Sequence, residues 1–342
     1  SAAQSSSAAQ SSSAAQSSSV AQSSSVAQSS SVAQSSSMSA SSASSSVASS
    51  SSSVSSVEVR GVYVAQDTVI LRLDLAGSGW TTFYTRTGAD GNIHTGGLAI
   101  DATAKKLYWI EQPTSGTKKI RRADLSGANV EDVHVFATQA NWFKSLCVDP
   151  RAGGKIYWWN GSDRKIYACD KDGSNASVLV TASSTYFDIA AVNMTLDLVN
   201  DRIVWTNGSL ARNKVYYIPL TGGTETAIVT ITTTTGWAPG KFAVNPATGK
   251  MYWAAYFNDD NDGDFRMADY PSGANMYIID GNEAGSGRPA EQIACDPVAD
   301  RIWFIHVTKT GSTLKYANGS DGSGVTATTH TGYWGAIAVY NE

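Results

Sequence analysis

One recurring segment constrains the fold of this chain more than any other feature. Each copy is an apolar run ending in Asp or Asn, then a short polar turn and an aromatic run; the copy at Leu146 reads LCVDPRAGGKIYWWN. Related copies begin at Leu98, Leu196, Phe242 and Ile293. Their Asp or Asn residues lie 48 residues apart over three intervals and 51 apart over the last. A period of roughly 40 to 50 residues is typical of one β-propeller blade.

Each copy continues with two more predicted strands. The third strands are predicted at 119–123, 165–169, 214–218, 265–268 and 313–317. A turn rich in Asp, Gly and Ser follows, such as DLSGAN at Asp124, and then a fourth strand such as VHVF at Val133 or SVLV at Ser177. Short apolar runs bounded by such turns indicate strands. Four strands per copy predict one antiparallel sheet per copy and an all-β fold.

The two ends of the repeat region predict how many blades there are. Residues 62–84 supply a second, third and fourth strand with no first strand, and GAIAVYNE at Gly335 is a first strand with nothing after it. If the last strand completes the first blade, the ring closes with six blades. Closure hides strand edges that would otherwise pair with other chains. We therefore predict a six-bladed β-propeller over residues 57–342, closed by its C-terminal strand.

The aromatic runs resemble the YWTD repeats of the low-density-lipoprotein-receptor class B. The resemblance covers residues 60–342 in outline and includes IRRADLSG at Ile120, which is similar to that family's third strand and turn. It implies six blades, and it implies binding rather than catalysis. The pairs that carry it are Tyr108-Trp109, Tyr157-Trp158 and Tyr252-Trp253, with Val204-Trp205 and Trp303-Phe304 in register.

Residues 1–56 form a low-complexity arm of Ser, Ala, Gln and a few Val. SAAQSS occurs three times and then SVAQSS three times. A six-residue period is commensurate with a strand or a polyproline-type helix but not with an α-helix, so we expect an extended arm. The hexads are also weakly similar to those of left-handed β-helices. The positions that repeat are Gln4, Gln10, Gln16, Val20, Val26 and Val32.

Two functions are compatible with such an arm. Too little apolar surface is present for the arm to order by itself, so an ordered arm needs a surface outside itself. Extended, 56 residues reach up to roughly 180 Å, far enough to lie across neighbouring copies. We expect a structural subunit of a homopolymeric filament or sheath, because an open contact repeated between subunits makes a fibre. The alternative is a flexible stalk that carries a carbohydrate- or protein-binding propeller, such as an adhesin or fibre head.

Charge and sequence motifs bear on location and partners. The net charge of −4 gives no reason to expect a nucleic-acid partner. The sequence has no run of about 18 apolar residues, so we predict no membrane span. The chain starts at Ser1 without a methionine; either a signal peptide has been removed, as we expect for an extracellular protein, or this sequence starts late. Cys147, Cys169 and Cys295 do not suggest a disulfide framework and read as buried apolar residues. Sequons for N-glycosylation start at Asn160, Asn175, Asn193, Asn207 and Asn318.

Two further groups of residues are candidate binding sites. The loop NDDNDGD places Asn258, Asp260, Asp262 and Asp264 close together, in a spacing similar to a calcium loop; the competing interpretation is a solvated hairpin loop. Aromatic residues precede several first strands and could stack on sugars, cap the core or pack against a neighbouring subunit. The three we single out are Trp142, Trp237 and Trp334.

Catalysis has little support in the sequence. His94, His134, His306 and His330 are dispersed without metal-ligand spacing, and no nucleophile elbow or phosphate-binding Gly motif is present. The Asp residues that recur in each repeat are expected to cap turns. We therefore predict a protein that is not an enzyme and has no cofactor other than the calcium considered above.

Overall fold

The last strand of the chain pairs with the first, as the sequence predicts. The computed structural model describes residues 60–87, 92–113, 116–137, 143–181, 193–206, 214–231, 239–257, 262–281, 287–288, 292–308, 311–332 and 335–341. Within them β25 (Ala336–Tyr340) runs antiparallel to β1 (Gly61–Gln66), with Gly61 opposite Tyr340 and Ala65 opposite Ala336. This pairing completes the first blade and closes the ring.

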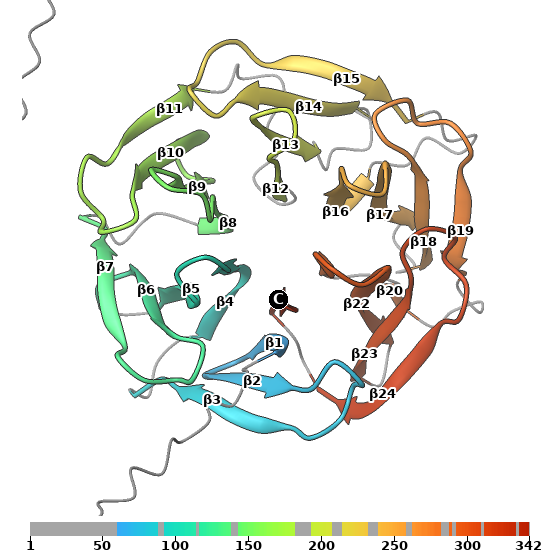
Figure 1. Ribbon diagram of the computed structural model, residues 1–342, viewed down its shortest axis with the longest axis horizontal. Helices are drawn as coiled ribbons and strands as arrows, with labels where there is room; N and C mark the ends of the chain where they lie inside the picture. The colour runs from blue at the N-terminus through green and yellow to red at the C-terminus, as the bar shows by residue number, and fades with distance from the viewer. Residues whose placement is uncertain are drawn as a thin grey trace, which may run out of the picture. The chain divides into compact units, whose positions relative to one another are not determined.

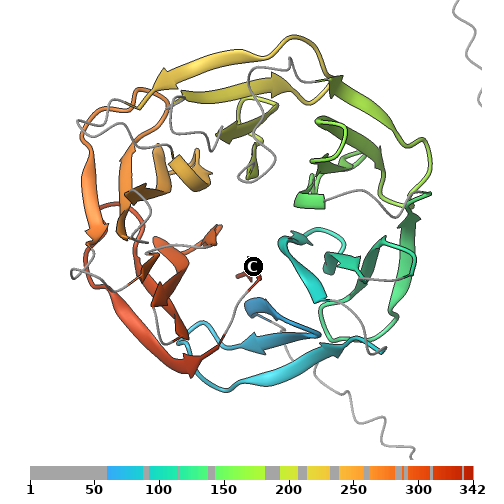
Figure 2. The same cartoon turned by 180° about the vertical axis from the view of Figure 1, so that it is seen from behind.

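Six antiparallel sheets surround a central channel, each running from an inner to an outer strand (Figures 1 and 2). Blade 1 is β25, β1, β2 (Val69–Leu73) and β3 (Thr81–Thr85). Blade 2 is β4 (Asn92–Asp101), β5 (Lys106–Gln112), β6 (Lys119–Asp124) and β7 (Glu131–Val135). Blade 3 is β8 (Phe143–Val148), β9 (Lys155–Asn160), β10 (Lys165–Asp170) and β11 (Ser177–Thr181).

The other three blades follow the same order. Blade 4 is β12 (Met194–Asp197), β13 (Arg202–Thr206), β14 (Lys214–Pro219) and β15 (Thr226–Thr230). Blade 5 is β16 (Pro239–Asn245), β17 (Lys250–Phe257), β18 (Asp262–Asp269) and β19 (Tyr277–Asp280). In blade 6 the inner position is shared by β20 (Gly287–Arg288) and β21 (Ile293–Cys295), which both pair with β22 (Arg301–Thr308); β23 (Gly311–Asn318) and β24 (Thr326–Thr331) complete it.

The aromatic pairs fill the spaces between blades. Successive side chains of a strand point to opposite faces, and both faces of each blade are covered. Trp109 therefore packs with Tyr63 of blade 1, whereas its neighbour Tyr108 packs with Trp158 of blade 3. The described residues form six apolar clusters of this kind, one for each pair of adjacent blades. Burial on both faces explains why second strands read as continuous apolar runs instead of alternating ones.

A β-bulge and a glycine join each blade to the next. On β7 the pairing with β6 shifts between His134 and Asp132, so Val133 is an extra residue. The carbonyl oxygen of Val133 lies against Gly173 of blade 3, which has a left-handed φ of 87°. Two other joints have the same contact between a carbonyl oxygen and a turn glycine, Phe83 with Gly127 and Leu179 with Gly222. In the remaining three the turn glycine lies against a side chain of the preceding outer strand, and the pairs are Val229 with Gly273, Ile279 with Gly322, and Thr328 with Gly77.

Candidate functional site

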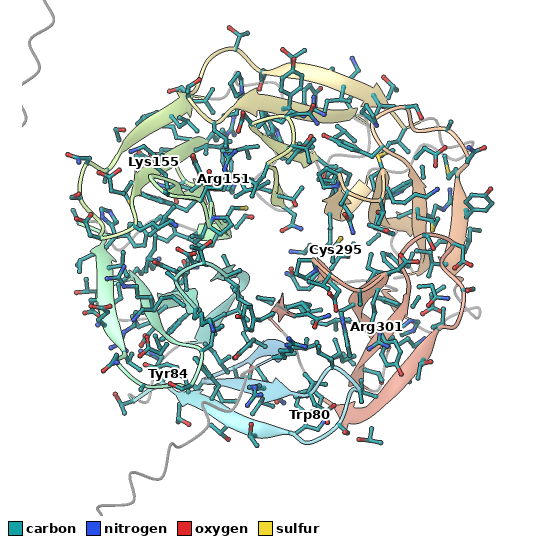
Figure 3. The ribbon with its side chains drawn as sticks, in the orientation of Figure 1. Trp80, Tyr84, Arg151, Lys155, Cys295 and Arg301 are labelled. Atoms are coloured by element: carbon teal, nitrogen blue, oxygen red, sulfur yellow. The ribbon has the colours of Figure 1, made fainter. Side chains whose placement is uncertain are left out.

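A cavity occupies the central channel of the ring. Its volume is about 430 Å³, and the inner strands of all six blades line it. Most of the wall is aliphatic, and the residues that project from it include Ile100, Leu196, Ala294 and Val339. Cys295 lies at the inner side of blade 6, toward this channel (Figure 3). Pockets of this size are large enough to hold a ligand, and an apolar wall favours an uncharged one.

The thiols near the channel are poor nucleophiles. Cys147 is 7% exposed and its Sγ lies 3.3 Å from the carbonyl oxygen of Met194. Burial raises the pKa of the Cys147 thiol to about 12. Because the thiolate is the reactive form, this thiol stays protonated near neutral pH. Cys169 is also buried, and all three cysteines are free.

One face of the ring carries the turns that join first to second strands and third to fourth strands; we call it the turn face. The Asp that ends an inner strand caps the turn that follows it, as the sequence predicts. Oδ1 of Asp101 accepts from the N–H of Ala104 at 3.0 Å, and Oδ1 of Asp296 accepts from the N–H of Val298 at 2.9 Å. Asn245 plays the same role in blade 5. The Asp carboxylates accept hydrogen bonds from backbone amides of the turns, which explains why Asp recurs once per repeat.

The channel opens on the turn face through an apolar rim. Three consecutive turns place apolar residues around the opening, and we call these six residues the collar. Val199 is 72% exposed and Val298 is 66% exposed, which makes them the two most exposed of the large apolar side chains described. The collar consists of Leu198 and Val199 in blade 4, Pro246 and Ala247 in blade 5, and Pro297 and Val298 in blade 6.

Polar contacts between blades surround the channel mouth. In blade 4, Asp197 is fully buried and accepts from Arg202 Nε and from the hydroxyl of Tyr270 in blade 5, each at 2.8 Å. Burial opposes ionisation of Asp197, but the hydrogen bonds from Tyr270, Asn200 and Arg202 outweigh it and hold its pKa below the usual value. A carboxylate held in this way stabilises the ring and is poorly suited to accept a substrate proton.

Equivalent contacts join other blades. Lys171 of blade 3 forms an ion pair with Asp101 of blade 2 at 2.6 Å. Arg151 of blade 3 reaches Asp201 of blade 4 at 2.6 Å. Between blades 6 and 1, Arg301 donates to the carbonyl oxygen of Leu75 (Figure 3). The charged side chains of the turn face are therefore largely paired with each other.

Two buried ionic clusters occupy equivalent positions in different blade interfaces. Between blades 1 and 2, Glu111 accepts from Arg86 at 2.9 Å and from Arg121 at 3.2 Å. Between blades 5 and 6, Asp280 meets Lys315 at 2.7 Å and His306 at 3.0 Å. Glu111 and His306 hold the same position in their second strands. The carboxylate comes from the second strand in one interface and from the preceding blade in the other.

Sequence reasoning missed these clusters. The signal was present, since an ionisable residue stands in an otherwise apolar second strand, and the third strand has a basic residue paired with the position two residues before it. In the first cluster, the hydroxyl of Tyr84 in blade 1 also accepts from Arg121 in blade 2 at 2.6 Å (Figure 3). Both clusters are enclosed between blades, so they hold adjacent blades together and do not line the channel.

The structure places only part of the candidate calcium site. Asn258 and Asp260 lie outside the described residues, as does the side chain of Asp262. Asp264 lies within β18, and its carboxylate is bonded to Arg266 at 2.7 Å. In the described ranges no group of three or more potential metal-ligating side chains comes together. Calcium binding at this hairpin stays a prediction.

Several other predicted residues fall outside the described ranges. These are the aromatic candidates Trp142, Trp237 and Trp334, the whole arm from Gln4 to Val32, and the sequon at Asn207. No helix among the described residues is long and apolar enough to cross a bilayer.

The remaining sequons divide into two kinds. Asn160 is 2% exposed, and Asn193 is buried with its amide donating to the carbonyl oxygen of Phe242 at 2.6 Å. A glycan on either side chain is incompatible with this packing, because both side chains are buried among neighbouring residues. Asn175 and Asn318 are exposed in turns between third and fourth strands. Of the four described sequons, these two leave room for a glycan.

No protein-family model matches the chain. A chain in the crystal structure of the nidogen–laminin complex superimposes with a TM-score of 0.63 at 15% identity, over 82% of this chain and 97% of that one. TolB from Acinetobacter baumannii gives 0.61 at 12% identity, over 81% and 66%. The GH74 xyloglucanase from Xanthomonas campestris gives 0.55 at 17% identity, over 78% and 43%. At these identities the likeness shows the fold: the chain is a six-bladed β-propeller structurally similar to the nidogen propeller and to TolB.

Proposed function

We propose that this protein is the structural subunit of an extracellular homopolymeric filament or sheath, in which residues 1–56 of one copy pack on neighbouring propellers. The observation that carries the proposal is where the arm joins the ring. Arg60 is exposed, and Gly61 begins β1 opposite Tyr340, at the end of the blade that faces the turns. The arm is therefore attached to a face of a ring that is already closed, and it is not needed to complete a blade.

One property of the described residues and one of the arm's sequence support an architectural role. The carboxylates around the channel mouth are held by turn amides and by neighbouring Arg, Lys and Tyr side chains, so this face offers shape and apolar surface to a partner. The arm carries no charged residue before Glu58, so many copies can gather without repulsion between arms. An uncharged extended segment that adds to another subunit is an established mode of recognition.

The second candidate is a stalked propeller that binds a protein or carbohydrate. The exposed collar at the channel mouth favours it, because exposed apolar patches on a soluble protein often mark an interaction site. The nidogen chain was crystallised in a complex with laminin, and a comparable role would make this propeller a binding head.

Electron microscopy of negatively stained samples separates the two functions. We would compare the full chain, a truncation that starts at residue 57, and a chain whose residues 1–56 are replaced by a Gly/Ser segment of equal length. Filaments or sheets from the full chain alone are expected. Polymers from the truncation would contradict an essential arm. A full chain that stays monomeric at every concentration would favour the stalked binding head.

A further inference from the structure

The collar contains the two most exposed large apolar side chains among the described residues. Its six residues come from three consecutive turns; five of them line the channel cavity, and Val298 follows Pro297 in the turn of blade 6. The folded ring does not need Val199 or Val298 to be apolar, because their side chains are 72% and 66% exposed. Prolines 246 and 297 stiffen two of the three turns, so the collar presents a fixed shape instead of a mobile one.

The carboxylates beside the collar already accept hydrogen bonds from within the ring. Both carboxylate oxygens of Asp296, which is 1% exposed, lie 3.0 Å from the side-chain amide of Asn341. Asp197 is held by Arg202 and Tyr270. A charged occupant of the collar would lose hydration without gaining an opposite charge, whereas an uncharged occupant would bear no such cost.

The arm of this chain has the composition that the collar requires. Residues 1–56 are uncharged, and their apolar side chains are almost all Ala and Val. Arg60, the first described residue after the arm, lies on the same face as the collar. Arg60 precedes the strand that pairs with β25, and Asn341 at the end of β25 contacts Asp296, which begins the Pro297–Val298 turn. In the other blades a turn joins the first strand to the second. In blade 1 this position is taken by Arg60, which follows the arm, and by Asn341 near the end of the chain.

We propose that the collar is the docking site for the arm of a neighbouring copy, with the Ala/Val hexads of residues 1–36 lying across the channel mouth and against Val199 and Val298. This inference rests on the proposed function, since it names the surface that receives the arm. Both the arm root and the collar lie on the turn face. An arm that runs along this face reaches the mouth of a ring lying beside its own, and an extended arm of up to roughly 180 Å is long enough.

This arrangement makes a specific kind of polymer. The contact is between two different surfaces, an arm and a collar, so it is heterologous and can repeat from one copy to the next without closing. Repetition generates a row or layer of rings with their turn faces on the same side. Such a layer corresponds to a sheath more closely than to a single-file stack of rings.

The test uses the full chain with a double substitution in the collar, Val199→Asp and Val298→Asp. Both positions are mostly solvent-exposed, so the carboxylates stay hydrated in the monomer and the ring folds. The matched control is Val135→Asp with Val178→Asp, which changes two valines that are 54% and 44% exposed on outer strands. Circular dichroism and the urea midpoint check that both variants are folded. Electron microscopy and sedimentation measure assembly.

We expect the wild type and the control to polymerise, and the concentration needed by the collar variant to rise at least tenfold. Equal assembly by the collar variant and the wild type would overturn the collar as the docking site while leaving the polymer intact. A wild type that never polymerises would overturn both proposals together.

A second measurement identifies the occupant directly. A photo-crosslinking amino acid at position 199 is introduced into isotopically labelled chain and mixed with unlabelled full chain before assembly. The expected product links position 199 to an unlabelled peptide from residues 1–56. A link to another collar would show that two rings meet face to face, and a link only to the arm of the same chain would show a self-contact. Either result would overturn the proposal.

Discussion

The joint between a bulged outer strand and a turn glycine makes a sharp prediction about stability. Gly173 has a φ of 87°, and a Cβ at this position would fall well under 3.0 Å from the carbonyl oxygen of Val133 in the preceding blade. The change Gly173→Ala therefore has two costs. A left-handed φ costs an L-residue about 1–2 kcal/mol. Forcing a methyl group into an already packed contact adds about 1–3 kcal/mol. Together they lower the free energy of unfolding by about 2–5 kcal/mol.

The chain offers a matched control in the same blade. Gly153 also has a left-handed φ, 71°, but a Cβ there would meet nothing within 4 Å. Gly153→Ala should lose only the backbone part, about 1–2 kcal/mol. The difference between the two variants isolates the contact between blades, and we expect about 1–3 kcal/mol. Urea unfolding of both variants, followed by tryptophan fluorescence, measures it. Equal destabilisation by the two substitutions would contradict a stabilising contact between Gly173 and Val133 of the preceding blade.

Three further predictions concern the buried groups. Because hydrogen bonds hold the pKa of Asp197 below its unfolded value, its stabilisation is present above the unfolded pKa, about 3.9, and is lost as pH falls through the folded pKa. Tyr270→Phe removes one of those bonds, so it should lower the free energy of unfolding by about 1–3 kcal/mol at neutral pH and make that free energy fall less steeply with acid. Urea midpoints of the variant and the wild type between pH 7 and pH 2 measure this. Equally steep falls in the two proteins would contradict it. Trp109→Ala should lower the free energy of unfolding by about 3–5 kcal/mol, whereas Val135→Ala on the surface should change it by less than about 0.5 kcal/mol. Thermal denaturation compares the two variants, and equal drops in melting temperature would contradict a core between the blades. Cys147 should resist a thiol reagent in the folded protein at pH 8 and react once urea unfolds the protein. Mass spectrometry measures the labelling. Rapid labelling of the native protein would show that the thiol is accessible from the channel, against this prediction.

The blade architecture could be predicted from the sequence because it repeats. The aromatic pair at Tyr157-Trp158 and the Asp that precedes it recur often enough to fix the period, and the incomplete ends at residues 62 and 335 fix the closure. Predicted strands agree with the observed ones to within a few residues; SVLV at Ser177 lies within β11, Ser177–Thr181. The turn-capping role of Asp101 and Asp296 is confirmed for the same reason.

The surfaces could not be predicted, because they depend on residues from different repeats meeting in space. The collar combines Val199 and Val298, which are about 100 residues apart and stand in turns that look unremarkable in isolation. The cluster of Asp280, His306 and Lys315 joins two blades, and its residues appear in the sequence as scattered polar positions. The sorting of sequons into buried and exposed sites likewise needs the packing.

The central claim is that residues 1–56 are ordered by other copies of the chain. Amide hydrogen exchange read by mass spectrometry tests this most directly, by comparing arm peptides in dilute monomer with the same peptides in assembled material. The arm is too poor in apolar surface to order alone, so it should exchange at the rate of an unstructured chain in the monomer. It should exchange at least tenfold more slowly in the assembly. Free exchange of the arm within assembled material would contradict the claim.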